Sequence, residues 1–221
     1  MEQVTSAVED YAKAIYALET RADGAVSTNA LAARLGVTAA SASNMVKKLA
    51  TLDLVTHEPY RGVQLTDSGR RVALEVMRHH RLLELYLSET LGLPWDRVHD
   101  EAEVLEHVLS EELEELIAQK LGNPTHDPHG DPIPTRDGRI EETPTRALQT
   151  LEAGERGHFV RISDSDPEML RYLSERGIAP PCELEVVDKQ PFDGPLFARV
   201  GDEVHVLGGA LARAMRVEVT G

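Results

Sequence analysis

A segment rich in proline and glycine limits what this chain can fold into. Residues 122–147, GNPTHDPHGDPIPTRDGRIEETPTRA, contain five prolines and three glycines. Proline ends helices and is excluded from central strands, so we expect no long regular element to cross this segment. We interpret it as a linker or as an irregular segment wrapped on the rest of the chain.

The hydrophobic pattern changes across that segment. Before it, apolar residues recur at helical spacing, as Tyr11, Ile15 and Leu18 do. After it, the stretches CELEVV, FARVG, EVHVLG and MRVEVT alternate or are β-branched, which is typical of strands. One helical stretch, PEMLRYLSERG, lies among them. The sequence therefore predicts a mainly α fold with a small β domain at its C-terminal end.

The N-terminal third has the order of a winged helix-turn-helix unit. A second helix stops at Gly36, and Thr38 is placed to cap a third helix. Two short strands over residues 54–57 and 62–65 follow, joined by a turn. Helix, glycine-containing turn, helix and two-strand wing is the order in which this unit places a helix in the major groove of DNA.

The third helix begins with small polar residues and continues with lysines, a composition that suits contacts with base edges and then with phosphates. The expected DNA contacts are Thr38, Ala39, Ala40, Ser41, Ser43, Asn44, Lys47, Lys48 and, at the wing tip, Arg61. Two alternatives stay open. The small residues are also compatible with a tight helix crossing, and some winged helices bind proteins.

The chain is strongly acidic, with a net charge of −15, which argues against nucleic-acid binding. The charge is unevenly distributed, however. Residues 1–72 carry eight basic and eight acidic side chains, whereas residues 73–140 carry six and 15. If any part of the chain meets DNA, it is therefore the first third. Cys182 is the only cysteine, and the chain has neither a long apolar run nor a basic leader, so we expect a cytoplasmic protein with no membrane partner.

The acid excess peaks in HDEAEVLEHVLSEELEE, residues 99–115, which holds two histidines and eight carboxylates in 17 positions. We predict one long helix over residues 99–121. Leu105, Val108, Leu109, Leu113 and Leu116 would form its core face, and His99, Glu103, Glu106 and His107 would share the opposite arc. The arc is either a solvated acidic surface or a set of metal ligands.

Further ligand types occur upstream. His80 and Glu84 are spaced four apart, so they share a helix face, and Asp10 lies beside the apolar stripe of the first helix. Imidazole with carboxylate suits Mn²⁺, Fe²⁺, Co²⁺, Ni²⁺ and Zn²⁺. Taken singly each residue has an ordinary structural explanation, but together they favour a metal site.

At this point the sequence resembles the metal-dependent repressors of the diphtheria toxin repressor and manganese transport regulator family. The resemblance covers about residues 5–135 and is carried by EDYAKAIYALE, VTAASASNMVKKL, YRGVQLTDSGRRVA, MRHHRLLE, VHDEAEVLEHVLSEELEE and GNPTHDPHGDPIP. It implies a homodimer that binds a palindromic DNA operator when a divalent metal is bound. The β segment resembles the SH3-like barrel of the longer members.

The resemblance also implies domains and ligands. The domains would be a winged-helix DNA-binding domain over residues 1–72, a helical metal-binding and dimerisation domain over 73–140, a linker over 141–147 and an SH3-like domain over 148–221. By position, the first metal site would use Asp10, Glu103, Glu106 and His107, and the second His80, Glu84 and His99 with a contribution from Asp164, Asp166 or Glu168. Asp166 is equally typical of a helix N-cap.

Two positions bear on which metal is sensed. Iron-type members have methionine and cysteine where this chain has Asp10 and Glu103, and oxygen ligands suit the hard Mn²⁺ ion better than sulfur does. Short manganese-type members have a second acid on the first helix where this chain has Lys13, so their closely spaced pair of ions is not expected here.

We therefore expect a Mn²⁺-activated repressor of metal-uptake genes, with an Fe²⁺-responsive repressor of iron homeostasis as the alternative. No organic cofactor is expected. A two-metal hydrolase is a distant third hypothesis, because the chain has no HExxH, GxSxG or phosphate-binding loop.

Overall fold

The computed structural model describes residues 5–22, 24–58, 62–192 and 194–220. It divides into two compact units. The first consists of Met1–His79, Glu106–Leu109 and Pro134–Arg139, and the second of His80–Leu105, Ser110–Ile133 and Ile140–Gly221. In the described part of the chain, no helix is both long enough and apolar enough to cross a membrane. The domain boundaries expected from the sequence stay predictions.

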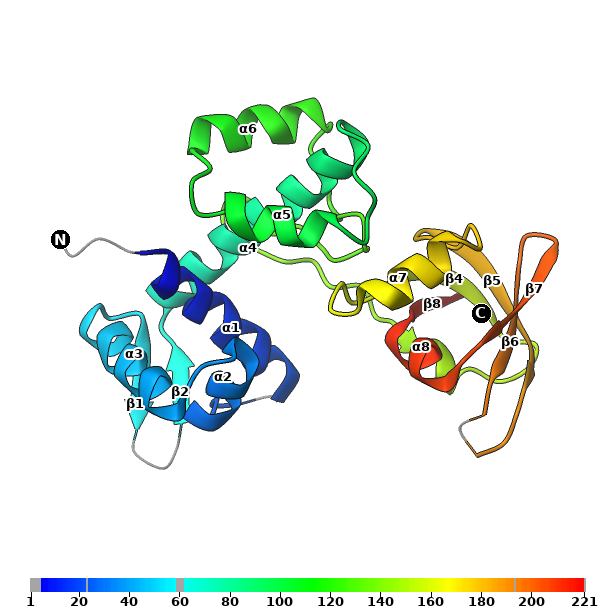
Figure 1. The fold of residues 1–221 in the computed structure, drawn as a ribbon, viewed down its shortest axis with the longest axis horizontal. Helices are drawn as coiled ribbons and strands as arrows, with labels where there is room; N and C mark the ends of the chain where they lie inside the picture. The colour runs from blue at the N-terminus through cyan, green and yellow to red at the C-terminus, as the bar shows by residue number, and fades with distance from the viewer. Residues whose placement is uncertain (1–4, 23, 59–61, 193, 221) are drawn as a thin grey trace. The chain divides into compact units, whose positions relative to one another are not determined.

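The first unit begins with a winged helix-turn-helix fold, as predicted (Figure 1). Its elements are α1 Ser6–Ala22, α2 Thr28–Leu35, α3 Ala39–Thr51, β1 Val55–Glu58, β2 Gly62–Leu65 and the start of α4 Asp67–Glu89. The hydroxyls of Ser27 and Thr38 cap α2 and α3 by accepting backbone N–H groups, both at 3.1 Å. Gly36 ends α2 in the left-handed conformation, with φ of 64°. Arg61 and the turn that carries it lie outside the described residues.

The core of this fold fixes the direction of α3. Ala42, Val46 and Leu49 of α3 are fully buried and belong to the same apolar cluster as Ile15 of α1 and Leu31 of α2. The opposite face of α3 is therefore presented to solvent. The strands β1 and β2 pair antiparallel, from Val55 opposite Leu65 to Glu58 opposite Gly62, and they form the wing.

The single helix predicted over residues 99–121 is wrong. The structure has two helices there, α5 Val98–Leu105 and α6 Glu111–Lys120. Ser110 adopts an extended backbone conformation and caps α6 by accepting the N–H of Leu113 at 3.3 Å. A serine cap in mid-segment starts a new helix rather than continuing the old one. Glu106 and His107 consequently lie in a turn after α5, not on a helix.

The predicted core face of that helix is also wrong. Val108 is 77% exposed and Leu116 is 55% exposed, and Leu105 and Leu113 are exposed as well. The buried side chains of this region are instead Val98, Ala102, Ile117 and Ala118, together with Glu106 and Glu114. Helical periodicity identified these apolar positions as one stripe. It predicted that the stripe is buried, whereas the structure places most of it at the surface.

The remainder of the second unit is mostly a β domain. Its elements are β3 Arg146–Ala147, the 3-10 turn η1 Leu148–Thr150, β4 Arg156–Arg161, α7 Pro167–Ser174, β5 Cys182–Lys189, β6 Leu196–Val200, β7 Glu203–Leu207, α8 Gly209–Ala214 and β8 Arg216–Thr220. The antiparallel sheet has the order β3-β8-β4-β5-β6-β7 around a core that includes Phe159 and Ile162. The small β domain is confirmed. Among the described strands no pairing joins β7 to β3, so the sheet is not closed into a barrel.

The proline-rich segment is an irregular segment held against this domain rather than a free linker. The N–H of Ile162, just after β4, donates to the carbonyl of His129 at 2.9 Å. Gly130 has φ of 85°, and a Cβ there would lie 1.8 Å from the carbonyl oxygen of Val160. Only glycine permits this approach of two backbones, and it fixes the loop that carries Asp127 and His129.

We predict that Gly130→Ala lowers the free energy of unfolding of this unit by at least about 2 kcal/mol, because both the backbone conformation and the packing forbid a Cβ. Urea unfolding followed by fluorescence of Trp95, the only tryptophan, measures it. Gly154→Ala is the control, since Gly154 has a similar φ of 90° but no atom within 4 Å of its Cβ position. Equal losses in the two variants would contradict the packing explanation.

Candidate metal centres

The first cluster joins α1 to the turn after α5. The Nε2 atom of His107 lies 3.0 Å from Oδ1 of Asp10 and 3.5 Å from Oε1 of Glu106. Three ligand atoms from these residues lie within 4.8 Å of one another. The other ring nitrogen, Nδ1, lies 2.6 Å from Oε2 of Glu9. Since a carboxylate only accepts, Nδ1–H donates to Glu9, and Nε2 is the ring nitrogen that faces Asp10 and Glu106.

Glu106 is the least accessible member of this cluster, at 1% exposure. An ionised carboxylate in such a position needs a positive partner. Lys13 of α1 provides one, with its Nζ 2.5 Å from Glu106 Oε1. The backbone carbonyl of Glu106 accepts from His79 Nδ1 at 3.2 Å, which fixes the turn against α4.

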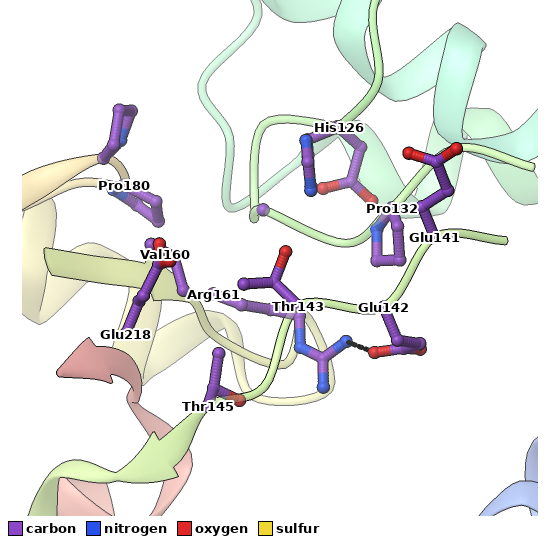
Figure 2. Close-up of a pocket in the computed structure, with 13 residues that line it drawn as sticks. His126, Pro132, Glu141, Glu142, Thr143, Thr145, Val160, Arg161, Pro180 and Glu218 are labelled. Carbon is purple, nitrogen blue, oxygen red and sulfur yellow. Dashed lines mark hydrogen bonds and ion pairs between the residues drawn. The ribbon is translucent and has the colours of Figure 1, made fainter.

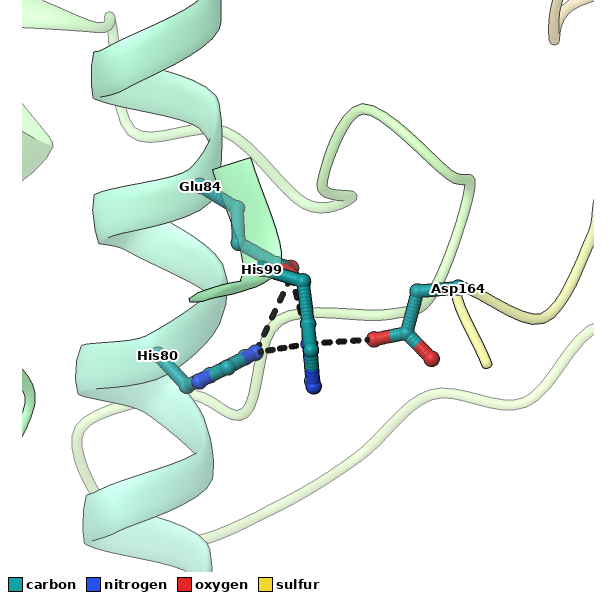
Figure 3. Close-up of side chains that lie close together, drawn as sticks. All are labelled: His80, Glu84, His99 and Asp164. Carbon is teal, nitrogen blue, oxygen red and sulfur yellow. Dashed lines mark hydrogen bonds and ion pairs between the residues drawn. The ribbon is translucent and has the colours of Figure 1, made fainter. Parts of the chain in front are cut away.

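The second cluster is centred on Glu84 of α4 (Figure 3). Glu84 Oε1 lies 3.0 Å from His80 Nε2 and 3.3 Å from His99 Nδ1, and these two nitrogens are 3.1 Å apart. Asp164, from the loop after β4, brings Oδ2 to 2.9 Å from His99 Nδ1. Two imidazoles and two carboxylates thus converge on one point, a donor set that fits a divalent transition-metal ion.

Asp127 and His129 extend this cluster on the far side of Glu84. His129 is fully buried, and its Nε2–H donates to the carbonyl of Trp95 at 2.8 Å. Its Nδ1 has no hydrogen-bond partner among the described residues and lies 3.7 Å from Glu84 Oε2 and 4.0 Å from Asp127 Oδ1. An unsatisfied buried nitrogen facing two carboxylates is a further ligand position.

Sequence reasoning missed Asp127 and His129. Both lie in the irregular segment DPHGDP, where no helical or strand period places side chains on a face. The sequence did contain one indication: Asp127 and His129 are two potential ligands only two residues apart, and Gly130 follows them directly.

The charges of this second cluster are strongly coupled. Hydrogen bonds to Asp164 and Glu84 raise the pKa of His99 to about 10. Burial would raise the pKa of the Glu84 carboxyl, but His129, His80 and His99 hold that pKa well below its usual range. Burial opposes a charge on His129, yet Glu84 raises the pKa of His129 to about 9. Burial, with Asp131 and Glu84 nearby, raises the pKa of Asp127 to about 8. In the absence of an ion at neutral pH, His99, His129 and Asp127 therefore carry protons, whereas Glu84 is ionised.

Three further predicted ligands lie as follows. The carboxylate of Glu103 lies beside two ring nitrogens of the second cluster, 3.8 Å from His80 Nδ1 and 3.9 Å from His99 Nε2. Asp166 caps α7 by accepting the N–H groups of Glu168 and Met169. Glu168 is exposed. The structure thus brings Asp164, of the three acids considered in this loop, to His99.

A cavity of about 260 Å³ lies between the proline-rich segment and the β domain (Figure 2). Prolines 132, 180 and 181 and Val160 line it together with charged side chains, of which Arg161 pairs with Glu142 at 3.3 Å. In Figure 2 the side chain of Arg161 points to Glu142, whereas Glu141 and Glu218 lie apart from this pair. The cavity therefore lacks the geometry of the two clusters.

Comparison with known proteins accounts for this combination of a winged helix and ligand clusters. Residues 3–63 match the family model "Iron dependent repressor, N-terminal DNA binding domain", residues 66–135 match "Iron dependent repressor, metal binding and dimerisation domain", and residues 146–219 match "FeoA domain". The iron-dependent repressor IdeR of Mycobacterium tuberculosis is 30% identical over 99% of both chains. The diphtheria toxin repressor of Corynebacterium efficiens is 33% identical over 99% of this chain and 97% of its own.

The chain belongs to the family of iron-dependent repressors. It is thus a DNA-binding, metal-dependent transcriptional repressor with a dimerisation domain, and the hydrolase hypothesis is excluded. A solved structure described as a manganese-dependent transcriptional repressor in complex with manganese is 44% identical, with a TM-score of 0.88 over 96% of this chain and 100% of its own. Relatives described by iron and by manganese thus both occur.

Helix α3 exposes most of the side chains that were predicted to contact DNA. On α3, Ala39, Ala40, Ser41, Asn44 and Lys47 are exposed, while Ser43 and Lys48 are half-buried. Thr38 is exposed and also serves as the N-cap. The face opposite the core thus combines short side chains with a terminal pair of lysines, and its role in contacting DNA is a prediction.

We predict that metal binding at the second cluster tightens as pH rises. At pH 7 His99 carries a proton, because its pKa is about 10, and an ion needs its neutral lone pair. The apparent dissociation constant for Mn²⁺ should fall about tenfold per pH unit for each proton displaced between pH 6 and 8. Trp95 stacks on His129 with ring centroids 5.7 Å apart, so its fluorescence measures this step. A dissociation constant independent of pH would contradict the prediction.

Proposed function

We propose that this repressor is activated by Mn²⁺ and represses metal-uptake genes from a palindromic operator, acting in the cytoplasm. The observation that carries the proposal is the chemistry of the donor sets. Both clusters consist of carboxylate oxygens and imidazole nitrogens, with no sulfur atom among their members. Oxygen-rich sets suit hard ions such as Mn²⁺, whereas thiolate and thioether ligands favour softer ones.

Fe²⁺ is the second candidate, because curated relatives that span the whole chain are described as iron-dependent. Nitrogen and oxygen ligands also bind Fe²⁺, and the ordinary affinity order places Fe²⁺ above Mn²⁺. Selection of Mn²⁺ therefore rests on ligand geometry and on the metals available in the cell. Anaerobic titration of operator binding with each ion decides between them.

The first centre is the proposed switch. Asp10 lies on α1, which begins the winged-helix fold, whereas Glu106 and His107 lie in the turn between the helices of the dimerisation domain. A divalent ion held by these residues would supply two positive charges, whereas Lys13 alone supplies one beside Glu106. Asp10, Glu106 and His107 then hold α1 to that turn. In a dimer this fixes the spacing of the two α3 helices, which must match half-sites about 34–36 Å apart or a multiple of this.

A second copy of the chain is the proposed partner for the exposed apolar face. Val104, Leu105, Leu113 and Leu116 of α5 and α6 are exposed in the single chain. A contiguous patch of leucine and valine on a monomer marks an interaction surface. Leu105, Leu113 and Leu116 were predicted to be buried, and an isologous interface between two copies would bury them together with Val104.

We predict that His107→Ala loses metal-dependent operator binding while keeping its fold. The loss of Nε2 leaves Asp10 and Glu106 without their neutral ligand, so the operator affinity gained on adding Mn²⁺ should fall by at least about tenfold. Mobility-shift titration in chelated and Mn²⁺-supplemented buffer measures it. The control is His158→Ala, which removes a half-buried histidine of β4. If His107→Ala gains as much operator affinity from Mn²⁺ as the wild type does, the proposal that the first centre is the switch is wrong.

We also predict that Leu116→Asp converts the dimer to a monomer, since it places a charge in the proposed interface. Light scattering after size-exclusion chromatography gives the mass. Val204→Asp, which charges an equally exposed apolar position on β7 of the β domain, should stay dimeric. If Leu116→Asp is dimeric as well, the partner surface lies elsewhere.

A further inference from the structure

The first centre contains a positive charge of its own. Lys13 Nζ contacts Oε1 of Glu106 at 2.5 Å, and this is the same oxygen that faces Nε2 of His107 at 3.5 Å. Lys13 follows Asp10 by three residues on α1, so the two side chains share a helix face. The ammonium group thus occupies the side of Glu106 that is turned toward the other ligands.

We propose that Lys13 is a built-in counter-cation that sets the metal threshold of this repressor. In the metal-free protein its ammonium group neutralises buried Glu106, and it must leave Oε1 before that oxygen can bind an ion. The inference rests on the proposed metal-dependent function, because it concerns the same centre.

Electrostatics and flexibility both support this exchange. The ammonium group is a compact charge on a flexible stem of four carbons, and the side chain of Lys13 is 20% exposed, so it can move into solvent without unfolding α1. Keeping a unit charge beside a divalent ion at contact distance is unfavourable in a partly buried site. The ion therefore has to compete with Lys13 for Glu106, which weakens its binding.

A merely structural role makes the opposite prediction. If Lys13 only held Glu106 in the orientation that the ion needs, then removing it would weaken metal binding. The sign of the change in affinity separates the two roles, independently of any measurement on DNA.

The test compares Lys13→Met with the full-length wild type at pH 8. Free Mn²⁺ measured by electron paramagnetic resonance gives the dissociation constants, and Trp95 fluorescence identifies the step that belongs to the second cluster. We expect the other step to tighten by about tenfold or more, because the competing charge is gone. The Trp95 step should not change. Lys120→Met removes an exposed lysine at the end of α6 and should leave both steps unchanged.

Two further variants keep the test decisive if Lys13→Met is poorly folded. Lys13→Gln keeps a donor for Glu106 without the charge, and it should tighten the same step. Lys13→Arg keeps the charge and should not tighten it. An unchanged or weaker first step in Lys13→Met and Lys13→Gln, in protein whose wild type binds Mn²⁺, overturns the proposal for Lys13 alone. Failure of the wild type to bind Mn²⁺ at that step would instead overturn the proposed function.

Discussion

Two buried glutamates are the constraint on which the rest of the structure depends. Glu84 and Glu106 are each 1% exposed, and an ionised carboxylate at such depth is strongly unfavourable unless positive charge surrounds it. Around Glu84 that charge comes from protonated histidines, and around Glu106 it comes from Lys13. The metal-free protein thus satisfies its ligands with protons and an ammonium group. Metal binding becomes an exchange of cations rather than the filling of an unpaired site.

The local parts of the fold could be predicted from the sequence because their signals are local. Ser27, Thr38 and Gly36 end and start helices through bonds to neighbouring residues, so α2, α3 and the wing follow from a short stretch of chain. The break before α6 was missed because an apolar stripe and an acidic face continue through it. The stripe itself was predicted to lie in the core, whereas the structure exposes it, because helical periodicity alone does not distinguish a buried apolar face from an exposed one.

Helical spacing pointed to the candidate ligands His80 and Glu84 but gave no signal for Asp127 and His129, which lie in irregular backbone. His80 and Glu84 share a face of α4, as their spacing predicts, and the ring of His99 from α5 lies against both of them. Asp127 and His129 reach Glu84 only because Gly130 lets the proline-rich segment lie directly on the backbone of β4. Ile162, whose N–H donates to the carbonyl of His129, is followed two residues later by Asp164. The β domain therefore contributes to the second cluster in two ways, through this backbone hydrogen bond and through the Asp164 carboxylate.

The most direct test of the account is to locate the ions themselves. Crystals of the protein grown with Mn²⁺ and measured at the manganese absorption edge should show anomalous peaks at both clusters. One peak is expected among Asp10, Glu106 and His107, with Lys13 withdrawn from Glu106. The other is expected beside Glu84. Saturating Mn²⁺ with no peak at the first cluster would contradict the claim that this centre is the switch.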